Sequence, residues 1–442
     1  MKAGEPILHR EPFTMVCYCD FAGQVRGKGF PACDLGDRWS AGIGWTPTNI
    51  MINCFGGIPA TPWGAAGDLV IRPDPAGEVK LDYGEGTPPE HFILGDVENL
   101  DGTPWDCCPR TYLKSALSEL RETHDIALRI AFEHEFTCSG VKPRLGSAYG
   151  LDAIRTIGDL PGVVLSAVDR AGLQPDTFLP EYSPGQFEIT VRHAPGVEAA
   201  DRAVKLRHIV KSAALHCGLE ATFAPILAKG AVGNGVHIHF SLEDGAGQPL
   251  SYDPQAKDGV SEVAGRFVAG ILRHGRALCA ITAPSVISYE RLRPNAWSAS
   301  STNLGKRDRE AFVRICPVSE RPGAEVARSF NFEYRAADAA ASPYLALGAL
   351  VRAGLDGLRR KDKAPPAVTL MDAAAMPDSQ RTQLGIVRLP QSLSEALDHL
   401  EKDDSLMPDS IRKPYVMHKR GEIQQVESVE FNALCAMYAQ VY

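Results

Sequence analysis

Four segments of the chain alternate apolar and polar side chains with a period of two, which is typical of a β-strand buried on one face. They are residues 126–136, 184–191, 235–242 and 330–335. In the first segment Glu133 and Glu135 share the polar face, and the others add groups such as Glu188, His237 and Arg335. We therefore expect one polar cavity lined by four strands of a curved sheet.

Paired carboxylates on these strands have a chemical consequence. Two carboxylates on one enclosed face repel each other and need compensating positive charge, commonly a divalent cation. For a single strand such as 126–136, a solvated polar face at a sheet edge explains the pattern equally well. Its repetition in four strands favours the shared cavity.

The rest of the pattern divides the chain into a β-rich first section and a longer mixed section. Strands are expected at residues 14–20, 25–29 and 68–74, before a composition shift near residues 101–109. An exposed excursion is expected at residues 359–381. Helices are expected at residues 111–122, 161–173, 200–217, 261–281, 343–358, 393–402 and 429–438.

Composition limits the class of protein. The 442 residues include 44% hydrophobic and 23% charged residues, as in a soluble globular protein of two or three domains. The formal net charge of −8, without a basic cluster, argues against a nucleic-acid partner or a membrane surface. No apolar run approaches the roughly 18 residues of a membrane span, and residues 1–13 lack a signal-peptide core. The 11 cysteines form no CxxC pair, so we expect a reducing cytoplasm.

Six motifs in sequence resemble the glutamine synthetase superfamily, most closely its glutamate-amine ligase branch. They are FEHEF (132–136), EYSPGQFEI (181–189), GNGVHIHFSL (233–242), SYERLRP (288–294), RDREAFVRI (307–315) and FEYRAADAAASPYLALGAL (332–350). The resemblance implies an α+β fold, with an N-terminal β-grasp domain at residues 1–105 and a catalytic domain at residues 106–442. The catalytic sheet should be curved and antiparallel. A ring-shaped homo-oligomer, commonly a dodecamer of two hexamers, is also implied.

The resemblance also implies two divalent cation sites. The ligands of one would be Glu135, Glu181 and Glu188, and those of the other Glu133, His237 and Glu333. The residue types agree with this assignment, because carboxylates with one imidazole suit Mg²⁺ or Mn²⁺.

Further matches concern L-glutamate and ATP. Positions that hold glutamate are matched by Gly233, His237, Arg291 and Arg335, with Arg291 toward the α-carboxylate and Arg335 toward the reacting one. Arg309 and Arg314 match arginines that meet the nucleotide phosphates, and His239 and Ser241 match nucleotide-side positions. Arg309 and Arg335 are the expected catalytic residues. The implied chemistry is ATP-dependent conversion of a carboxylate to an acyl phosphate, which an amine then attacks.

The chain departs from ammonia-using members where ammonia would bind. Trp297 stands at the position of a flap glutamate, and residues 42–49 contain no aspartate. An ammonium site needs negative charge and a base, so these losses favour an organic amine, with Trp297 packing against its apolar part. A small alkylamine or an aromatic amine has the least need of such acidic groups in the site. Trp297 as a mere packing substitution is the plain alternative.

Other functions stay open at this point. They are an ammonia-using glutamine synthetase, a γ-glutamylpolyamine or γ-glutamylethanolamine synthetase, a non-catalytic member of the superfamily, and an unrelated two-metal hydrolase.

Overall fold

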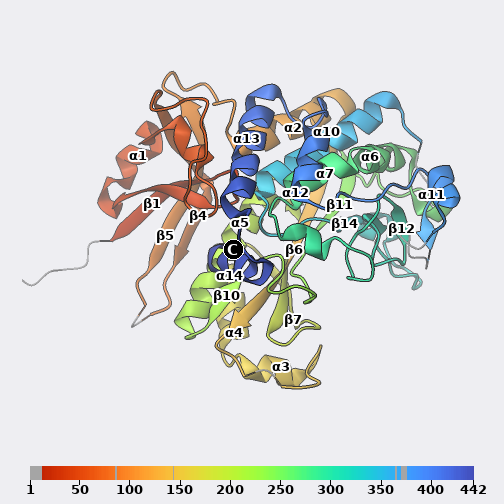
Figure 1. Cartoon of the computed structure of the whole chain (residues 1–442), viewed down its shortest axis with the longest axis horizontal. Helices are drawn as coiled ribbons and strands as arrows, with labels where there is room; N and C mark the ends of the chain where they lie inside the picture. Colours follow the sequence, from red (N-terminus) through yellow and green to blue (C-terminus); the bar gives the residue numbers. More distant parts are fainter. Residues whose placement is uncertain (1–11, 85–86, 143, 364–365, 370–375) are drawn as a thin grey trace, which may run out of the picture.

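The computed structural model describes residues 12–84, 87–142, 144–363, 366–369 and 376–442. They form a five-stranded sheet from the N-terminal section and a ten-stranded sheet from the rest, each with associated helices (Figure 1). The expected N-terminal domain includes residues 1–11 and 85–86, which lie outside the described residues, as do residues 364–365 and 370–375 of the expected excursion.

The smaller sheet has the order β2-β1-β5-β4-β3. Its strands are β1 (Phe13–Cys19), β2 (Val25–Pro31), β3 (Ile43–Trp45), β4 (Leu69–Leu81) and β5 (Glu90–Asn99). A β1–β2 hairpin lies beside β5, which runs parallel to β1, as expected of a β-grasp arrangement. The three predicted strands are confirmed, but β5 and β3 were not predicted.

The larger sheet has the order β15-β12-β13-β14-β11-β6-β8-β7, with β9 and β10 also paired to β6. Pairing is antiparallel from β13 through to β7, whereas β12 runs parallel to β13 and β15. Its strands are β6 (Ile126–Ser139), β7 (Pro175–Pro180), β8 (Gln186–Val191), β9 (Ala194–Pro195), β10 (Glu220–Thr222), β11 (Val236–Asp244), β12 (Leu304–Lys306), β13 (Val313–Ile315), β14 (Phe332–Tyr334) and β15 (Val368–Thr369). The expected antiparallel sheet is therefore extended at one edge by parallel strands.

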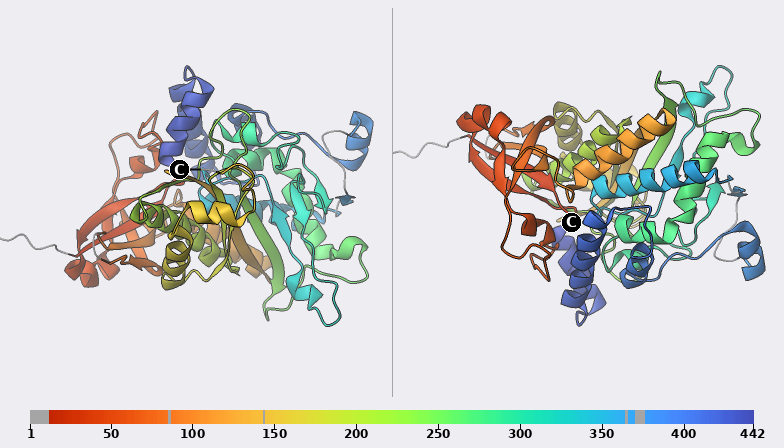
Figure 2. Two further views of the ribbon diagram at one scale, coloured as in Figure 1. Left: turned by 90° about the horizontal axis from the view of Figure 1, so that it is seen from below. Right: turned by 90° about the horizontal axis from the view of Figure 1, so that it is seen from above.

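Strand β6 has the two faces that its alternation predicts. Ile126, Leu128, Ile130, Phe132 and Phe136 are all at most 3% exposed and belong to the main hydrophobic core. That core is continuous with buried side chains of α2 and α10, which lie side by side in the view from above (Figure 2). The apolar face is thus covered and also includes the buried His134, whereas Arg129, Glu133 and Glu135 are turned to the other side.

Fourteen α-helices lie within the described residues. They are α1 (Leu35–Ala41), α2 (Pro109–His124), α3 (Leu151–Thr156), α4 (Leu160–Arg170), α5 (Gly196–His216), α6 (Glu262–Arg273), α7 (Gly275–Thr282), α8 (Ser288–Arg291), α9 (Val326–Ser329), α10 (Pro343–Arg360), α11 (Asp378–Leu384), α12 (Leu393–Leu400), α13 (Asp409–Val426) and α14 (Phe431–Val441). The helix predicted at residues 261–281 is wrong as one element, because it is divided at His274. The His274 imidazole lies 2.5 Å from Asp403 Oδ2 and 3.0 Å from Asp356 Oδ2.

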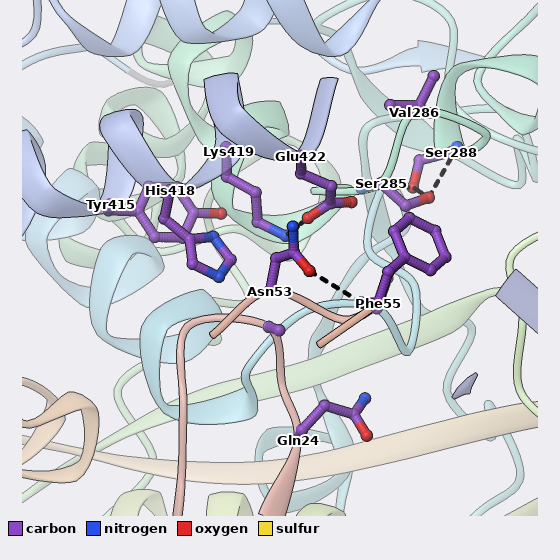
Figure 3. Close-up of polar contacts among 12 residues, drawn as sticks. Gln24, Asn53, Phe55, Ser285, Val286, Ser288, Tyr415, His418, Lys419 and Glu422 are labelled. Carbon is purple, nitrogen blue, oxygen red and sulfur yellow. Dashed lines mark hydrogen bonds and ion pairs between the residues drawn. The ribbon is translucent and has the colours of Figure 1, made fainter. Parts of the chain in front are cut away.

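Helix α13, which was not predicted, connects the N-terminal section to the catalytic section through buried polar groups (Figure 3). Lys419 Nζ lies 2.9 Å from Glu422 Oε2, and both side chains are 0% exposed. The hydroxyl of Tyr438 donates to Glu422 Oε1 at 2.6 Å. Asn53 Nδ2 donates to Gln425 Oε1 at 2.6 Å. Buried charges of this kind are tolerated only when they are paired.

Replacing Glu422 with alanine should therefore lower the free energy of unfolding by about 3–5 kcal/mol, because Lys419 would be buried without a partner. The measurement is guanidinium-induced unfolding, with Glu427→Ala, at an exposed position just beyond the same helix, as the matched control. The control should stay within about 0.5 kcal/mol of the wild type. An equal decrease in the free energy of unfolding of the two variants would contradict the stabilising role of the buried Lys419–Glu422 pair.

Candidate active site

The register of the larger sheet brings the predicted polar residues together. His237 on β11 is opposite Glu133 on β6, and His239 is opposite Glu333 on β14. His237 Nδ1 lies 3.3 Å from Glu133 Oε2 and 3.5 Å from Glu333 Oε1. Glu133, His237 and Glu333 each offer one ligand atom within 4.8 Å of the others. This group consists of the three residues expected at one cation site.

A second group lies on the other side of His237. Glu135 on β6 is opposite Glu188 on β8, and these two carboxylates and His237 again offer ligand atoms within 4.8 Å of one another. Glu181, just after β7, is outside both groups, but the charge of Glu135 helps to raise its pKa after the larger effect of burial. The structure thus gathers five of the six predicted cation ligands and places the sixth within electrostatic reach.

The pKa shifts reveal an excess of negative charge around Glu188. Burial, together with the charges of Glu133 and Glu135, raises the pKa of Glu188 to about 9. Burial would also raise the pKa of Glu333, but the charges of His237 and Arg335 outweigh it and lower this pKa to about 2. Carboxylate oxygens and an imidazole nitrogen are suitable ligands for Mg²⁺ or Mn²⁺, so these residues fit a pair of such cations.

Two predicted arginines flank Glu333. Arg314 on β13 places Nη1 2.9 Å from Glu333 Oε2, and Arg335 pairs with Oε1 of the same carboxylate. Arg335 Nε also donates to the backbone carbonyl of Arg309 at 2.8 Å. Arg309 itself is exposed, and its charge reaches Tyr149, whose pKa it lowers against the stronger raising effects of burial and Glu181. Cationic groups therefore border the carboxylate cluster on the β13–β14 side.

Arg291, at the end of α8, is 4% exposed. Its guanidinium donates to Ser298 Oγ at 2.8 Å and to the carbonyls of Ala336 and Ala337 at 2.7 Å each. A Cβ at Gly233 would lie only 2.6 Å from Arg291 Cγ. Gly233 is therefore a position where the absence of a side chain admits the arginine. Two of the residues expected to hold glutamate, Gly233 and Arg291, are therefore in close proximity.

Trp297 lies next to Arg335, since its carbonyl accepts from Arg335 Nη2 at 3.4 Å. Its side chain is 70% exposed, and its backbone has φ 55°, in the left-handed region that aromatic residues rarely adopt. Both carboxylate oxygens of Glu310 accept backbone N–H groups of this segment, from Trp297 and Asn295, at 3.1 Å each. Glu310 thus holds the segment in its unusual conformation.

The residues expected on the nucleotide side, His239 and Ser241, lie farther along β11. His239 Nε2 is 3.1 Å from Glu133 Oε1, and His239 Nδ1 is 2.9 Å from Asn331 Oδ1. Ser241 is two residues beyond His239 on the same strand face and pairs in register with Arg129 of β6.

Three residues of this region were missed in the sequence. Burial and the charge of Glu181 raise the pKa of Tyr149, Glu310 holds the Trp297 segment, and the Cys316 thiol is 3.5 Å from His239 Nδ1. Glu310 lies within the RDREAFVRI motif, which was a usable signal, whereas Tyr149 and Cys316 lie outside the quoted motifs. A cavity of about 760 Å³, lined by residues such as Arg110 and Lys205, contains none of the predicted site residues.

Comparisons with known proteins agree with the fold. The family model for the glutamine synthetase catalytic domain matches residues 106–438, and that for the glutamine synthetase N-terminal domain matches residues 9–105. Gamma-glutamylpolyamine synthetase GlnA3 of Streptomyces coelicolor is 32% identical over 97% of this chain and 93% of its own length. Glutamine synthetase of Pyrococcus furiosus is 33% identical over 88% of this chain and 85% of its own length. A crystal structure of a novel glutamine synthase homolog superposes with a TM-score of 0.90 at 37% identity, covering 99% of this chain and 100% of that chain.

The curved sheet with its carboxylate, imidazole and guanidinium groups has the glutamine synthetase fold and is that of a ligase. The chain belongs to the glutamine synthetase family. Its similarity to gamma-glutamylpolyamine synthetase fits the glutamate-amine ligase branch. Members of the family use ATP and divalent metals such as Mg²⁺ or Mn²⁺.

Proposed function

We propose that the protein activates the γ-carboxylate of L-glutamate with ATP and transfers the acyl group to an organic amine. The first step forms an acyl phosphate and ADP, and the second forms a γ-glutamylamide and releases phosphate. The observation that carries the proposal is the position of Trp297, an exposed residue whose backbone carbonyl accepts from Arg335, where an acidic flap residue is expected.

The proposed roles follow from the geometry. Arg335 would bind the reacting carboxylate, while Arg291 and Gly233 would hold the α-carboxylate end of glutamate. Arg309 and Arg314 would meet the phosphates, with His239 and Ser241 on the nucleotide side. The two groups around His237 would hold Mg²⁺ or Mn²⁺, which when bound neutralises phosphate charge.

The amine would lie between the Trp297 segment and Glu181. Trp297 offers an apolar surface, residues 295–297 contain no acid, and both oxygens of the adjacent Glu310 are occupied by backbone N–H groups of this segment. Burial and the charge of Glu135 raise the pKa of Glu181. This environment favours a small alkylamine or an aromatic amine, the latter being neutral at pH 7, over a cation that needs several carboxylates.

Two other substrates are supported by relatives. The name of the Streptomyces coelicolor relative favours a polyamine, and that of the Pyrococcus furiosus relative favours ammonia. A polyamine and ammonia are therefore both included in the experiment that follows.

The test is release of phosphate from ATP and glutamate with ammonia, methylamine, aniline and spermidine, with the amide identified by mass spectrometry. We expect methylamine or aniline to exceed ammonia in kcat/KM. The Trp297→Glu variant should lower that preference at least about tenfold, whereas Trp297→Phe, which keeps an aromatic ring, should retain it. Ammonia exceeding every organic amine in the wild type would refute the proposal, and a preference for spermidine would move it to polyamines.

We also propose a domain division at residue 105, a homo-oligomer in the form of a dodecamer of two hexameric rings, and a cytoplasmic location. The supporting observations are the two sheets and the sequence features described above. In the described part of the chain, no helix is long and apolar enough to span a membrane.

A further inference from the structure

A third group of potential metal ligands lies beside the two described above. It consists of His239 on β11, Cys316 directly after β13, and Glu333 on β14, each offering one atom within 4.8 Å of the others. Cys316 Sγ is 3.5 Å from His239 Nδ1 and 4.0 Å from Glu333 Oε2. Cys316 is 7% exposed and therefore fixed by its surroundings. The group differs from the other two because it contains sulfur.

These distances suit a tetrahedral zinc ion. With Zn–S near 2.3 Å and Zn–N near 2.0–2.1 Å, tetrahedral angles place the sulfur and nitrogen ligands about 3.5 Å apart. The Cys316–His239 separation has that value without any movement. Glu333 needs to approach the thiol by a few tenths of an ångström, which a carboxylate rotation supplies.

The imidazole of His239 is also oriented for a metal at Nδ1. Its Nδ1 is the ring nitrogen that faces the Cys316 thiol, while its buried Nε2 lies 3.1 Å from Glu133 Oε1 without forming a hydrogen bond. Asn331 Oδ1, 2.9 Å from Nδ1, is a possible fourth ligand. Its orientation is fixed because Asn331 Nδ2 donates to the carbonyl of Ser329 at 2.9 Å.

We propose that His239 Nδ1, Cys316 Sγ and Glu333 Oε2 form a further binding site, which shares Glu333 with the Glu133–His237–Glu333 group, for a thiophilic divalent cation, Zn²⁺. On binding, the Cys316 thiol releases its proton to solvent as the Zn–S bond forms. Mg²⁺ and Mn²⁺ do not compete effectively there, because they prefer oxygen ligands.

Occupation of this site would inhibit the ligase, a consequence that rests on the proposed function. Zn²⁺ at Oε2 would displace Arg314, which now lies 2.9 Å from that oxygen, and would engage His239. Arg314 and His239 are both assigned to the nucleotide. Zn²⁺ bound at this site should therefore raise the KM for ATP.

The experiment compares the wild type with Cys316→Ser, and uses Cys33→Ser, which removes an exposed thiol, as the matched control. Each protein is equilibrated with Zn²⁺ in saturating Mg²⁺, and the bound zinc per chain is counted. A parallel titration with Co²⁺ records the thiolate-to-cobalt charge-transfer absorption. Thermal unfolding of each metal-free variant verifies folding.

We expect Cys316→Ser to bind one zinc ion fewer per chain and to lack the charge-transfer band, while Cys33→Ser matches the wild type. The proposed site would be overturned if the wild type and Cys316→Ser bound equal amounts of zinc and the wild type showed no cobalt charge-transfer band that depends on Cys316. These measurements need no turnover. Zinc binding without an increased KM for ATP would leave the site intact and instead contradict the role assigned to the nucleotide-side residues.

Discussion

Replacing Glu333 with glutamine is expected to lower kcat about a thousandfold. Glu333 is shared by Arg314, Arg335 and His237, and it is 1% exposed. An amide carries no negative charge, and its NH₂ group would face a guanidinium or the imidazole. The variant would thus weaken a proposed cation site and release the arginine assigned to the reacting carboxylate, and loss of one such electrostatic contact alone costs about 10²–10³ in rate.

The experiment measures ATP-dependent phosphate release and the number of Mn²⁺ ions bound per chain. Glu243→Gln is the matched control, because Glu243 lies on the neighbouring strand, β11, and pairs with Arg129 at 3.0 Å outside the cluster. The control should keep the wild-type rate and Mn²⁺ count. Since removing a buried ionic partner can also destabilise the fold, each variant is first verified by its unfolding transition. A Glu333→Gln enzyme within tenfold of the wild type would remove Glu333 from the proposed machinery.

The part of this site that the sequence predicts is the part carried by strands. A period of two dictates that Glu133 and Glu135 face away from the buried Phe132 and Phe136, and the structure has this arrangement. Which strands pair, and in which register, does not follow from periodicity. The contact of Glu133 with His237 therefore depended on the family resemblance.

Most of the site residues that were not predicted from the sequence lie in loops. Tyr149 and Cys316 reach the site from a turn and a strand end whose positions are set by long-range packing, so no local pattern indicates them, whereas the RDREAFVRI motif contained Glu310. Helix α13 was not predicted for another reason. It is polar and contains Pro414, and its buried Lys419–Glu422 pair resembles a solvated surface in sequence.

Metal-free protein should lose stability as the pH rises toward 9, because of Glu188. Burial and the neighbouring charges of Glu133 and Glu135 raise the pKa of Glu188 from 4.5 to about 9 in the folded state. Between these values the folded protein keeps a proton that the unfolded chain releases. The stabilisation is complete below pH 4.5 and is lost as the pH rises through about 9. The slope can reach about 1.4 kcal/mol per pH unit for one proton.

Comparison with Glu188→Gln isolates this group, because His239 and Glu181, whose pKa values are also raised, remain in both proteins. Unfolding free energies are measured with a chelator at pH 6, 7 and 8. The unfolding free energy of the variant should rise relative to that of the wild type at each step in pH, since glutamine resembles the protonated acid and cannot ionise. Saturating Mn²⁺ should reverse the order, because a cation that displaces the Glu188 proton stabilises only the wild-type carboxylate. A difference between the two proteins that is independent of both pH and Mn²⁺ would mean that Glu188 is neither protonated in the metal-free fold nor near the cation.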